Sequence, residues 1–248
     1  MAILFEAHKN GSCYQVRSAG ATRRLYSDGV LHSQWNPNAL ISGAIWDLMI
    51  LPGFLPRVAP KRILMLGLGG GTTVHLIRHF FPDAHITCVE IEPLHIRIAK
   101  QWFELPKNHV TVIKGDAYGF LKASNEQFDW IFDDVFQHVS GEPSRDNEAF
   151  ALLDTYRHCL AKHGLLSFNM IGRTQFEQVQ ALLPSFAFAN QFKHPLYDNR
   201  IVSFGDHWVD KKDFIARIRQ FKMLDNRFKT CRLRYQMREL KRPSGPCN

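Results

Sequence analysis

The strongest chemical signal is the glycine-rich stretch Leu66-Gly67-Leu68-Gly69-Gly70-Gly71-Thr72-Thr73, which follows an apolar run and opens a helical pattern. Glycines let a backbone approach a ligand closely, and the free N–H groups at the start of a helix favour an anionic or electron-rich group. No Gly-Lys-Ser/Thr follows, which excludes a Walker-type phosphate loop. A tight strand-to-helix turn without a ligand is the alternative explanation.

Acidic residues stand at the ends of the next predicted strands. Glu90 follows the glycine loop by about 20 residues, where a carboxylate can accept hydrogen bonds from both hydroxyls of a ribose. Asp116, in Gly115-Asp116-Ala117, is placed to accept a hydrogen bond from the amino group of adenine. Asp134 ends a fourth strand. Because ligands bind at the carboxyl ends of parallel strands, we expect these side chains to converge beside the glycine loop.

Two residues near Asp134 in the sequence are further candidates for the site. His138 lies just beyond the strand end and is a candidate general base, as is Asp134 itself. Asp133 is either a second acid in the crevice or faces away from it, since adjacent strand residues point to opposite faces. The other histidines and the five scattered cysteines lack metal-ligand spacing, so we expect no metal site and no disulfide framework.

An alternation of strand and helix patterns after Pro60 must position these residues. Short, continuously apolar runs are typical of parallel strands buried on both faces. We expect strands at 62–66, 85–90, 109–113, 128–133 and 165–170, and helices at 73–81, 94–103, 117–122 and 148–162. Gly164 is predicted to cap the last helix. An antiparallel pair, 186–192 and 200–204, would close the sheet of a doubly wound α/β domain.

The two ends of the chain have a different texture. Segments 24–26 and 30–32, joined at Ser27-Asp28-Gly29, predict a hairpin, and a helix is expected over 38–51, ended by Pro52-Gly53. Residues 210–248 contain twelve Lys and Arg against four Asp and Glu, which equals the whole net charge of +8. Helical spacing of Phe214, Ile218 and Phe221 favours an amphipathic helix with solvated cations over the alternative, a nucleic-acid or acidic-partner surface.

No apolar run approaches the ~20 residues of a membrane span, and Met1 to His8 shows no signal-peptide pattern. We therefore expect a soluble, cytoplasmic protein.

The motifs resemble those of the spermidine synthase family of polyamine aminopropyltransferases, which share the class I S-adenosylmethionine methyltransferase fold. Residues 67–72 resemble the family's G-G-G-D-G-G loop and Val89-Glu90-Ile91-Glu92 its V-E-I-D. Gly115-Asp116-Ala117 resembles its G-D-A/G, and 128–134 its Y-D-V-I-I-V-D. With the Asp28-Gly29 hairpin and the segments 195–197 and 202–205, the resemblance extends from about residue 25 to residue 205.

The resemblance implies a mostly parallel, seven-stranded, Rossmann-like sheet, a bound S-adenosylmethionine or its decarboxylated form, and a homodimer. Asp134 would lie at the reaction centre, with His138 as a second candidate base. The candidate residues for holding the donor are Gly67, Gly69, Gly70, Gly71, Glu90, Ile91, Asp116, Ala117 and Asp133. We divide the chain into an N-terminal β element with a linking helix (1–55), the donor-binding α/β domain (56–209), and a basic C-terminal helix and tail (210–248).

Several departures from the family fall in the polyamine half of its site. His32 stands at the Gln of the family's D-G-x-x-Q, and Ile41-Ser42-Gly43 replaces its Y-H-E. Gly70 replaces the loop aspartate, and Gln137 the second aspartate of D-S-x-D. A cationic polyamine would lose its charge-assisted hydrogen bonds without those carboxylates.

We therefore expect methyl transfer from S-adenosylmethionine to an unknown small nucleophile. An aminopropyltransferase with an altered acceptor site and a non-catalytic nucleoside-binding protein are the alternatives. Replacing Gly70 by Asp should shift the preference toward the decarboxylated donor.

Overall fold

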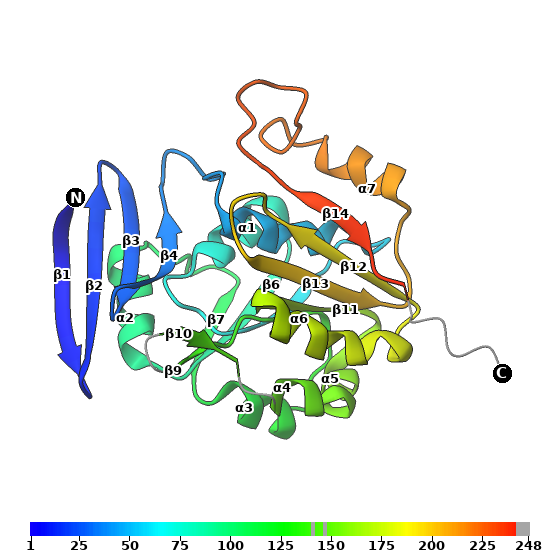
Figure 1. Ribbon diagram of the computed structural model, residues 1–248, viewed down its shortest axis with the longest axis horizontal. Coiled ribbons are helices and arrows are strands. Elements are labelled where there is room, and N and C mark those ends of the chain that lie inside the picture. Colours follow the sequence, from blue (N-terminus) through cyan, green and yellow to red (C-terminus); the bar gives the residue numbers. More distant parts are fainter. Residues whose placement is uncertain (140–141, 146–147, 242–248) are drawn as a thin grey trace.

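The computed structural model describes residues 1–139, 142–145 and 148–241, with backbone only at 137–139, 142–144 and 148. A central sheet of eight strands has the order β14-β12-β13-β11-β8-β5-β6-β7 (Figure 1). Strands β11, β8, β5, β6 and β7 run parallel, and β13, β12 and β14 extend the sheet by antiparallel pairing. This confirms the predicted α/β fold, with one strand more than expected.

The parallel half of the sheet follows from short apolar runs joined by helices. Its strands are β5 (Arg62–Leu66), β6 (His85–Glu90), β7 (Val110–Lys114), β8 (Phe128–Asp133) and β11 (Leu160–Ile171). The first connecting helices are α1 (Thr72–Phe80), α2 (Pro93–Trp102) and α3 (Ala117–Ala123). These elements match the predicted ones closely because a strand buried on both faces has a continuous apolar signature.

Residues 148–162 differ from the single helix predicted there. Two short helices, α4 (Glu148–Ala151) and α5 (Leu153–Cys159), are followed at once by β11. The prediction that Gly164 caps a helix is wrong, because it lies within β11, where the pairing with β8 shifts register between Leu160 and Leu165. A glycine inside a strand is typical of such an irregularity.

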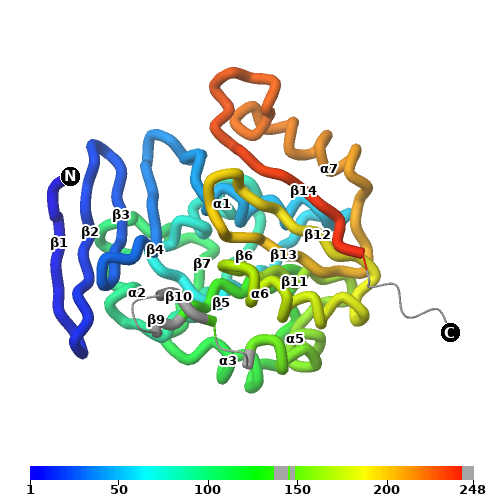
Figure 2. The backbone as a smooth tube through the Cα atoms, viewed as in Figure 1, coloured from blue at the N-terminus to red at the C-terminus, as the bar shows by residue number. Residues whose placement is uncertain are grey.

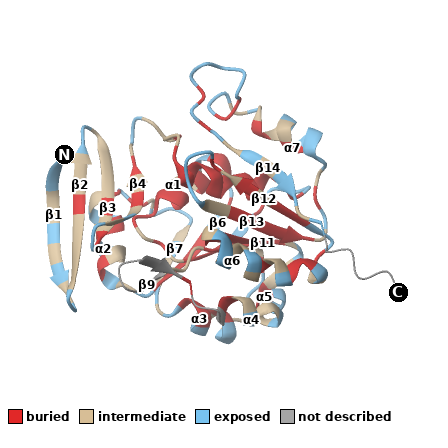
Figure 3. Cartoon of the chain, in the orientation of Figure 1, coloured by how far each residue is buried: buried red, intermediate tan, exposed pale blue. Residues whose placement is uncertain are grey.

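The N-terminal element is larger than the predicted hairpin. It is a four-stranded antiparallel sheet of β1 (Ala2–Lys9), β2 (Ser12–Ala19), β3 (Thr22–Ser27) and β4 (Val30–Trp35). The turn between β3 and β4 is the predicted one, with φ of 49° at Asp28 and 81° at Gly29. One face packs Val16, Leu25 and Trp35 against Ile98 of α2, while β1 stays largely accessible (Figure 3).

The segment predicted as a helix over 38–51 is instead a 3₁₀ helix, η1 (Ile45–Phe54). All ten of its residues are buried, Pro52 and Gly53 among them, so the expected stop at these two residues is wrong. With α1 and α7, η1 covers one face of the sheet, and α3 and α5 cover the other (Figure 1). Gly53 lies against the rings of Phe81 and Trp130.

The C-terminal third returns to the open edge of the sheet. After β11 come α6 (Gly172–Val179) and η2 (Gln180–Ser185), and then β12 (Phe188–Lys193) and β13 (Asn199–Gly205) form the predicted antiparallel hairpin. Helix α7 (Lys211–Ile218) buries Phe214 and Ile218, and the chain then runs back to add β14 (Gln236–Glu239) beside β12 (Figure 2). None of the helices in the described part of the chain is both long and apolar enough to cross a membrane.

The packing at Gly53 gives a stability prediction. A Cβ at this position would lie 2.6 Å from Cζ of Phe81 and 2.9 Å from Cζ3 of Trp130. Gly53→Ala should therefore lower the free energy of unfolding by about 1–3 kcal/mol, measured by urea denaturation. Gly115→Ala is the matched control, because a Cβ there meets nothing within 4 Å, and it should change stability by less than about 0.5 kcal/mol. Equal losses in the two variants would contradict the described packing.

Candidate active site at the carboxyl ends of the parallel strands

A cavity of about 580 Å³ lies at the carboxyl ends of β5, β6 and β8, beneath β3 and β4 of the N-terminal sheet. The structure brings most of the predicted site residues together there. Those that line it are Gly67, Gly69, Glu90, Ile91, Asp116, Ala117 and Asp134. Gly70, Gly71 and Asp133 do not line it.

The glycine loop joins β5 to α1 and depends on its glycines for close approach. Gly67 has a φ of 91°, and a Cβ there would lie 2.7 Å from the carbonyl oxygen of Asp134. Gly71, with a φ of 82°, is the N-terminal cap of α1. The loop therefore lies directly on the end of β8, which is why its backbone and Asp134 share one cavity.

Gly70 has a different role from the one its alignment suggested. It is buried, and its N–H donates a hydrogen bond of 2.7 Å to Oγ of Ser33. A Cβ at Gly70 would lie 2.8 Å from Cβ of Ser33 and 2.9 Å from Cε1 of Phe103. An aspartate at residue 70 would have to displace β4, so the expectation that Gly70→Asp shifts donor preference is not supported by the packing.

Glu90 is held as a carboxylate at the end of β6. Its Oε2 accepts hydrogen bonds from the N–H groups of Leu68 at 3.0 Å and Gly69 at 3.2 Å, and its Oε1 accepts one from Glu92 at 2.8 Å. Burial alone would raise the pKa of Glu90, but the interaction with His95 and these backbone donors outweigh it and lower the pKa to about 2. The side chain is therefore a fixed acceptor at any ordinary pH.

His95 is a site residue that the sequence reasoning missed. It lies in the first turn of α2, with Nδ1 3.7 Å from Oε2 of Glu90. Its ring also lies beside those of Tyr14 and His32, with centroids 5.6 Å and 5.3 Å away, and all three rings line the cavity. The sequence signal for His95 was its position five residues after Glu90. The first turn of a helix that follows a parallel strand lies beside the carboxyl end of that strand, where ligands bind.

Asp116 caps the next helix at the same edge of the sheet. As the N-terminal cap of α3, its carboxylate accepts a hydrogen bond from the N–H of Gly119. The side chain remains exposed and lines the cavity together with Ala117. A capping carboxylate uses one of its oxygens on the helix, so acceptor capacity is left for a ligand.

Asp134 lines the cavity, and its pKa is raised to about 7. Burial is the main cause, and the negative charges of Asp133 and Glu90 add to it. A hydrogen bond of 2.8 Å from Nδ2 of Asn169 and the charge of Arg145 act in the opposite direction. An acid whose pKa is near neutrality can exchange a proton with a reacting group under ordinary conditions.

A chain of amides orients Asp134. Asn169, on β11, donates to Asp134 and accepts a hydrogen bond of 3.0 Å from Nδ2 of Asn199, on β13. Both asparagines line the cavity. Sequence reasoning missed both, because isolated asparagines at strand ends carry no spacing signal.

Asp133 and His138 complete the predicted set. Asp133 is fully buried on the opposite side of β8 from Asp134, where it contacts Arg145 and Tyr156. Of the alternatives left open for this residue, the structure has the one that faces away from the crevice. His138 falls in the short strand β9 (Gln137–Val139), and its side chain lies outside the described residues.

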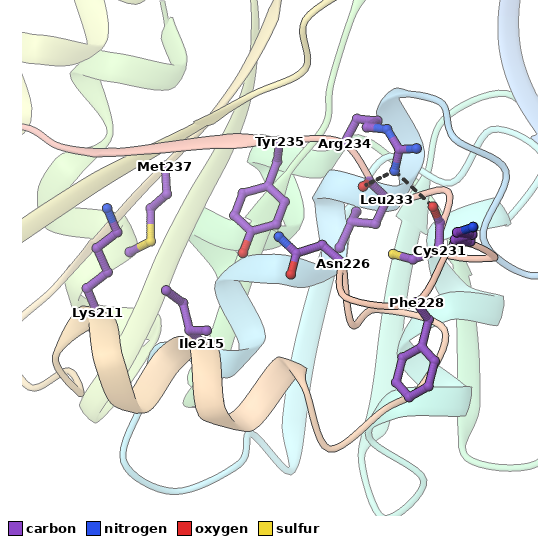
Figure 4. Close-up of a pocket in the computed structure, with 10 residues that line it drawn as sticks. Lys211, Ile215, Asn226, Phe228, Cys231, Leu233, Arg234, Tyr235 and Met237 are labelled. Atoms are coloured by element: carbon purple, nitrogen blue, oxygen red, sulfur yellow. Dashed lines mark hydrogen bonds between the residues drawn. The ribbon is translucent and has the colours of Figure 1, made fainter.

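A second cavity, of about 500 Å³, lies at the outer edge between α7 and the segment that leads to β14 (Figure 4). Lys211, Lys229 and Arg234 line it, and the guanidinium of Arg234 donates to the carbonyl oxygens of Cys231 and Leu233. Neither the glycine loop nor a strand-end carboxylate borders it.

Across the described residues, no group of three or more His, Cys, Asp and Glu could hold a metal ion. The strand-end cavity is therefore the candidate active site.

Comparison with known proteins agrees with this architecture. Residues 63–164 match the family model described as a methyltransferase domain. A polyamine aminopropyltransferase of Vibrio vulnificus is 36% identical over 92 residues, which is 36% of this chain and 31% of the relative. An N-terminal histidine N-methyltransferase of Emericella nidulans is 33% identical over 125 residues, 48% of this chain and 21% of the relative. The chain thus spans less than a third of the length of these two relatives.

Solved structures share the fold over most of the chain. A probable spermidine synthase from Corynebacterium glutamicum superposes with a TM-score of 0.76 at 18% identity, covering 96% of this chain and 91% of that one. Human methyltransferase-like protein 13, in complex with SAH, gives a TM-score of 0.58 at 20% identity and covers 73% of this chain and 89% of that one. Together these matches show that the chain has the methyltransferase fold, and that it is similar in sequence both to polyamine aminopropyltransferases and to N-methyltransferases.

Proposed function

We propose that this protein binds S-adenosylmethionine in the strand-end cavity and transfers its methyl group to a nucleophile positioned at Asp134. The observation that carries the proposal is the contrast between two carboxyl groups in one cavity. The pKa of Glu90 is lowered to about 2, whereas that of Asp134 is raised to about 7. Titratable groups whose environments separate their pKa values in this way mark a permanent acceptor and a proton-exchanging group.

The donor half of the cavity fits a nucleoside. Three backbone N–H groups occupy the carboxylate of Glu90, which has about four acceptor positions, so capacity remains for a ribose hydroxyl. Asp116, with Ala117, would accept from the amino group of adenine. The carboxylate of the intact donor would lie near N–H groups of the glycine loop or of the start of α1, which favour anions.

Asp134 would serve as the base of the transfer. As the bond from the nucleophile to the methyl carbon forms, the bond from that carbon to sulfur breaks and leaves a neutral thioether. The proton of the nucleophile passes to Asp134, which Asn169 holds in place. Because the sulfonium is already activated, alignment and proton removal are what this chain has to supply.

The acceptor side of the cavity supports a nucleophile other than a diamine. Its wall includes Leu31, Trp46 and Tyr197, and the loop acid of the polyamine enzymes is replaced by the buried Gly70. Two relatives bear on the acceptor by name, the Emericella enzyme and a Drosophila melanogaster eEF1A lysine and N-terminal methyltransferase homolog, 28% identical over 135 residues. Both names describe methylation of nitrogen, which supports a nitrogen nucleophile here.

Aminopropyl transfer is the second candidate, because the Vibrio relative is named as a polyamine aminopropyltransferase. The two reactions require different donors. Because no acid at residue 70 repels the carboxylate of the intact donor, and that carboxylate can accept a charge-assisted hydrogen bond from N–H groups of the glycine loop or of the start of α1, we expect intact S-adenosylmethionine to bind about 10- to 100-fold more tightly than the decarboxylated donor. Calorimetric titration with both donors measures this. Tighter binding of the decarboxylated donor, with aminopropyl transfer to putrescine, would establish the second candidate instead.

Glu90 tests the donor site. Glu90→Gln should weaken binding of S-adenosylmethionine by about 10- to 100-fold in calorimetric titration, because the charged acceptor for ribose is lost. Glu126→Gln, an exposed carboxylate before the amino end of β8, is the matched control and should leave affinity unchanged. If a folded Glu90→Gln protein retained full affinity, the nucleoside would have to bind elsewhere.

Asp134 sets the expected pH dependence. A base with a pKa of about 7 is protonated, and so inactive, at lower pH. Methyl transfer should therefore rise about tenfold per pH unit below 7 and level off above it. Asp134→Asn should lower the rate by about 10²- to 10⁴-fold while S-adenosylhomocysteine still binds. Turnover by this variant at the wild-type rate would remove Asp134 from the reaction, and donor binding without turnover on any acceptor would favour the non-catalytic alternative.

A further inference from the structure

The most deeply buried charges of the described chain lie directly behind the proposed base. The side chains of Arg145 and Asp133 are both fully inaccessible and form an ion pair. The other carboxylate oxygen of Asp133 accepts a hydrogen bond from the hydroxyl of Tyr156. Neither charged group touches the cavity, so donor binding and proton transfer leave this network without a role.

The guanidinium of Arg145 also binds two backbone carbonyls. Its Nη2 donates to the carbonyl oxygen of Asp133 at 3.1 Å and to that of Asn169 at 2.8 Å. The last paired residues of β8 and β11 are Asp133 and Phe168, so Asn169 is the first residue beyond the ladder. Arg145 thus links β8 and β11 just beyond their last backbone pair, Asp133 with Phe168.

Stability of the fold does not explain why two charged side chains are buried at this place. Replacing a buried ion pair by apolar side chains of similar volume is often neutral or stabilising. Asp133 stands where the resembling Y-D-V-I-I-V-D motif has Val, so an apolar residue suits this strand position. The rings of Phe136 and Phe168 lie 4.9 Å and 5.9 Å from the guanidinium carbon and would pack equally well on an apolar neighbour.

We propose that Arg145 is a positioning residue, which clamps the ends of β8 and β11 together through Asp133 and Asn169 and so holds the amide of Asn169 on the carboxyl group of Asp134. The role rests on the proposed function of Asp134 as the base. Asp134 directly follows Asp133, which Arg145 holds by its side chain and its carbonyl, and the carbonyl that Arg145 holds on β11 belongs to Asn169 itself. Arg145 need not touch a substrate, since it acts through the hydrogen bond between the two side chains.

The clamp has an electrostatic consequence at Asp134. The groups that act on this carboxyl are Arg145 and Asn169, which lower its pKa, and Asp133 and Glu90, which raise it. Removal of the whole network deletes the positive charge of Arg145 and the negative charge of Asp133, and these two losses have opposite effects on the pKa of Asp134. Loss of a fixed hydrogen bond from Asn169 has no such compensation and raises the pKa of Asp134.

The test compares an apolar replacement of the network with single changes. The triple variant Asp133→Val, Arg145→Met and Tyr156→Phe removes both charges of the ion pair and the hydroxyl that donates to Asp133. Only backbone groups then lose a partner among the hydrogen bonds described above: the N–H of Val135 and the carbonyl oxygens of Asp133 and Asn169. Arg145→Met alone strands a buried carboxylate and should lower Tm by about 10 °C, whereas the triple variant should stay within about 5 °C of the unmodified protein. Arg157→Met, which removes an exposed guanidinium 4.4 Å from the ring of Phe186, is the matched control.

The decisive readout is the titration of Asp134, followed by carbon-13 NMR of aspartate-labelled protein and assigned with Asp134→Asn. In the triple variant its midpoint should rise by about one pH unit or more, and in Arg157→Met it should not move. A triple variant with restored Tm and an unchanged midpoint would show that the network is only structural. Should the triple variant fail to fold, Arg145→Lys provides the test, because one ammonium cannot reproduce the paired N–H donors of a guanidinium. An unchanged midpoint of Asp134 in Arg145→Lys would equally contradict the proposed role of Arg145.

Binding of S-adenosylhomocysteine to the same proteins separates this inference from the proposed function. Affinity should be equal in the unmodified and triple-variant proteins, because Glu90 and Asp116 are untouched. No binding by the unmodified protein would refute the donor site, while the titration of Asp134 would still decide whether Arg145 positions it.

Discussion

Parallel pairing of β5, β6, β7, β8 and β11 is the constraint on which the site depends. In-register pairs such as Leu66 with Val89, Glu90 with Lys114 and Leu66 with Asp133 make the strands end at one edge of the sheet. Whatever residue follows each strand is therefore delivered to the same place. The glycine loop, Asp116 and Asp134 follow their strands, while Glu90 ends β6 and Asn169 lies near the end of β11. A single cavity therefore contains groups that lie up to about a hundred positions apart in the chain.

The surroundings of Glu90 and Asp134 then give these two carboxyl groups different chemistry. Glu90 is buried and Asp134 is half-buried, and the loss of hydration favours the neutral form of each. Glu90 has three backbone N–H donors and His95 beside it, and it remains ionised. Asp134 accepts a hydrogen bond from a single neutral amide and has two other carboxylates nearby, so its pKa rises to about 7. The difference comes from the groups around each carboxyl: His95 and three backbone N–H groups stabilise the charge of Glu90, whereas the charges of Asp133 and Glu90 oppose that of Asp134.

Much of this could be predicted from sequence, and the failures have physical causes. The parallel strands are continuously apolar, and β5, β6 and β8 were predicted to the residue. Strands β1 and β14 were missed because both lie at the edge of a sheet and contain only exposed or half-buried residues, so neither has the buried apolar run that marks the central strands. The helix predicted over 38–51 is η1, a 3₁₀ helix over Ile45–Phe54, because an apolar run buried on every side shows neither the type of a helix nor where it begins and ends.

Within the site, some residues could be predicted from the sequence and others could not. Residues in local motifs, such as the glycine loop and Glu90, could be predicted, because their spacing along the chain carries the signal. Asn169, Asn199 and Arg145 could not, since their partners lie 35, 30 and 12 positions away and only the fold brings them together. For Gly70, the alignment identified the missing acid, but only the packing of Ser33 and Phe103 shows why an acid does not fit.

The central claim is that one cavity holds the nucleoside on Glu90 and Asp116 and directs its sulfur toward Asp134. A crystal structure of the protein with S-adenosylhomocysteine tests this most directly. We expect the ribose on Glu90, the adenine beside Asp116 and Ala117, and the sulfur facing Asp134 across the space that an acceptor would occupy. Binding of the ligand in another part of the molecule, or in this cavity with its sulfur directed away from Asp134, would contradict the account.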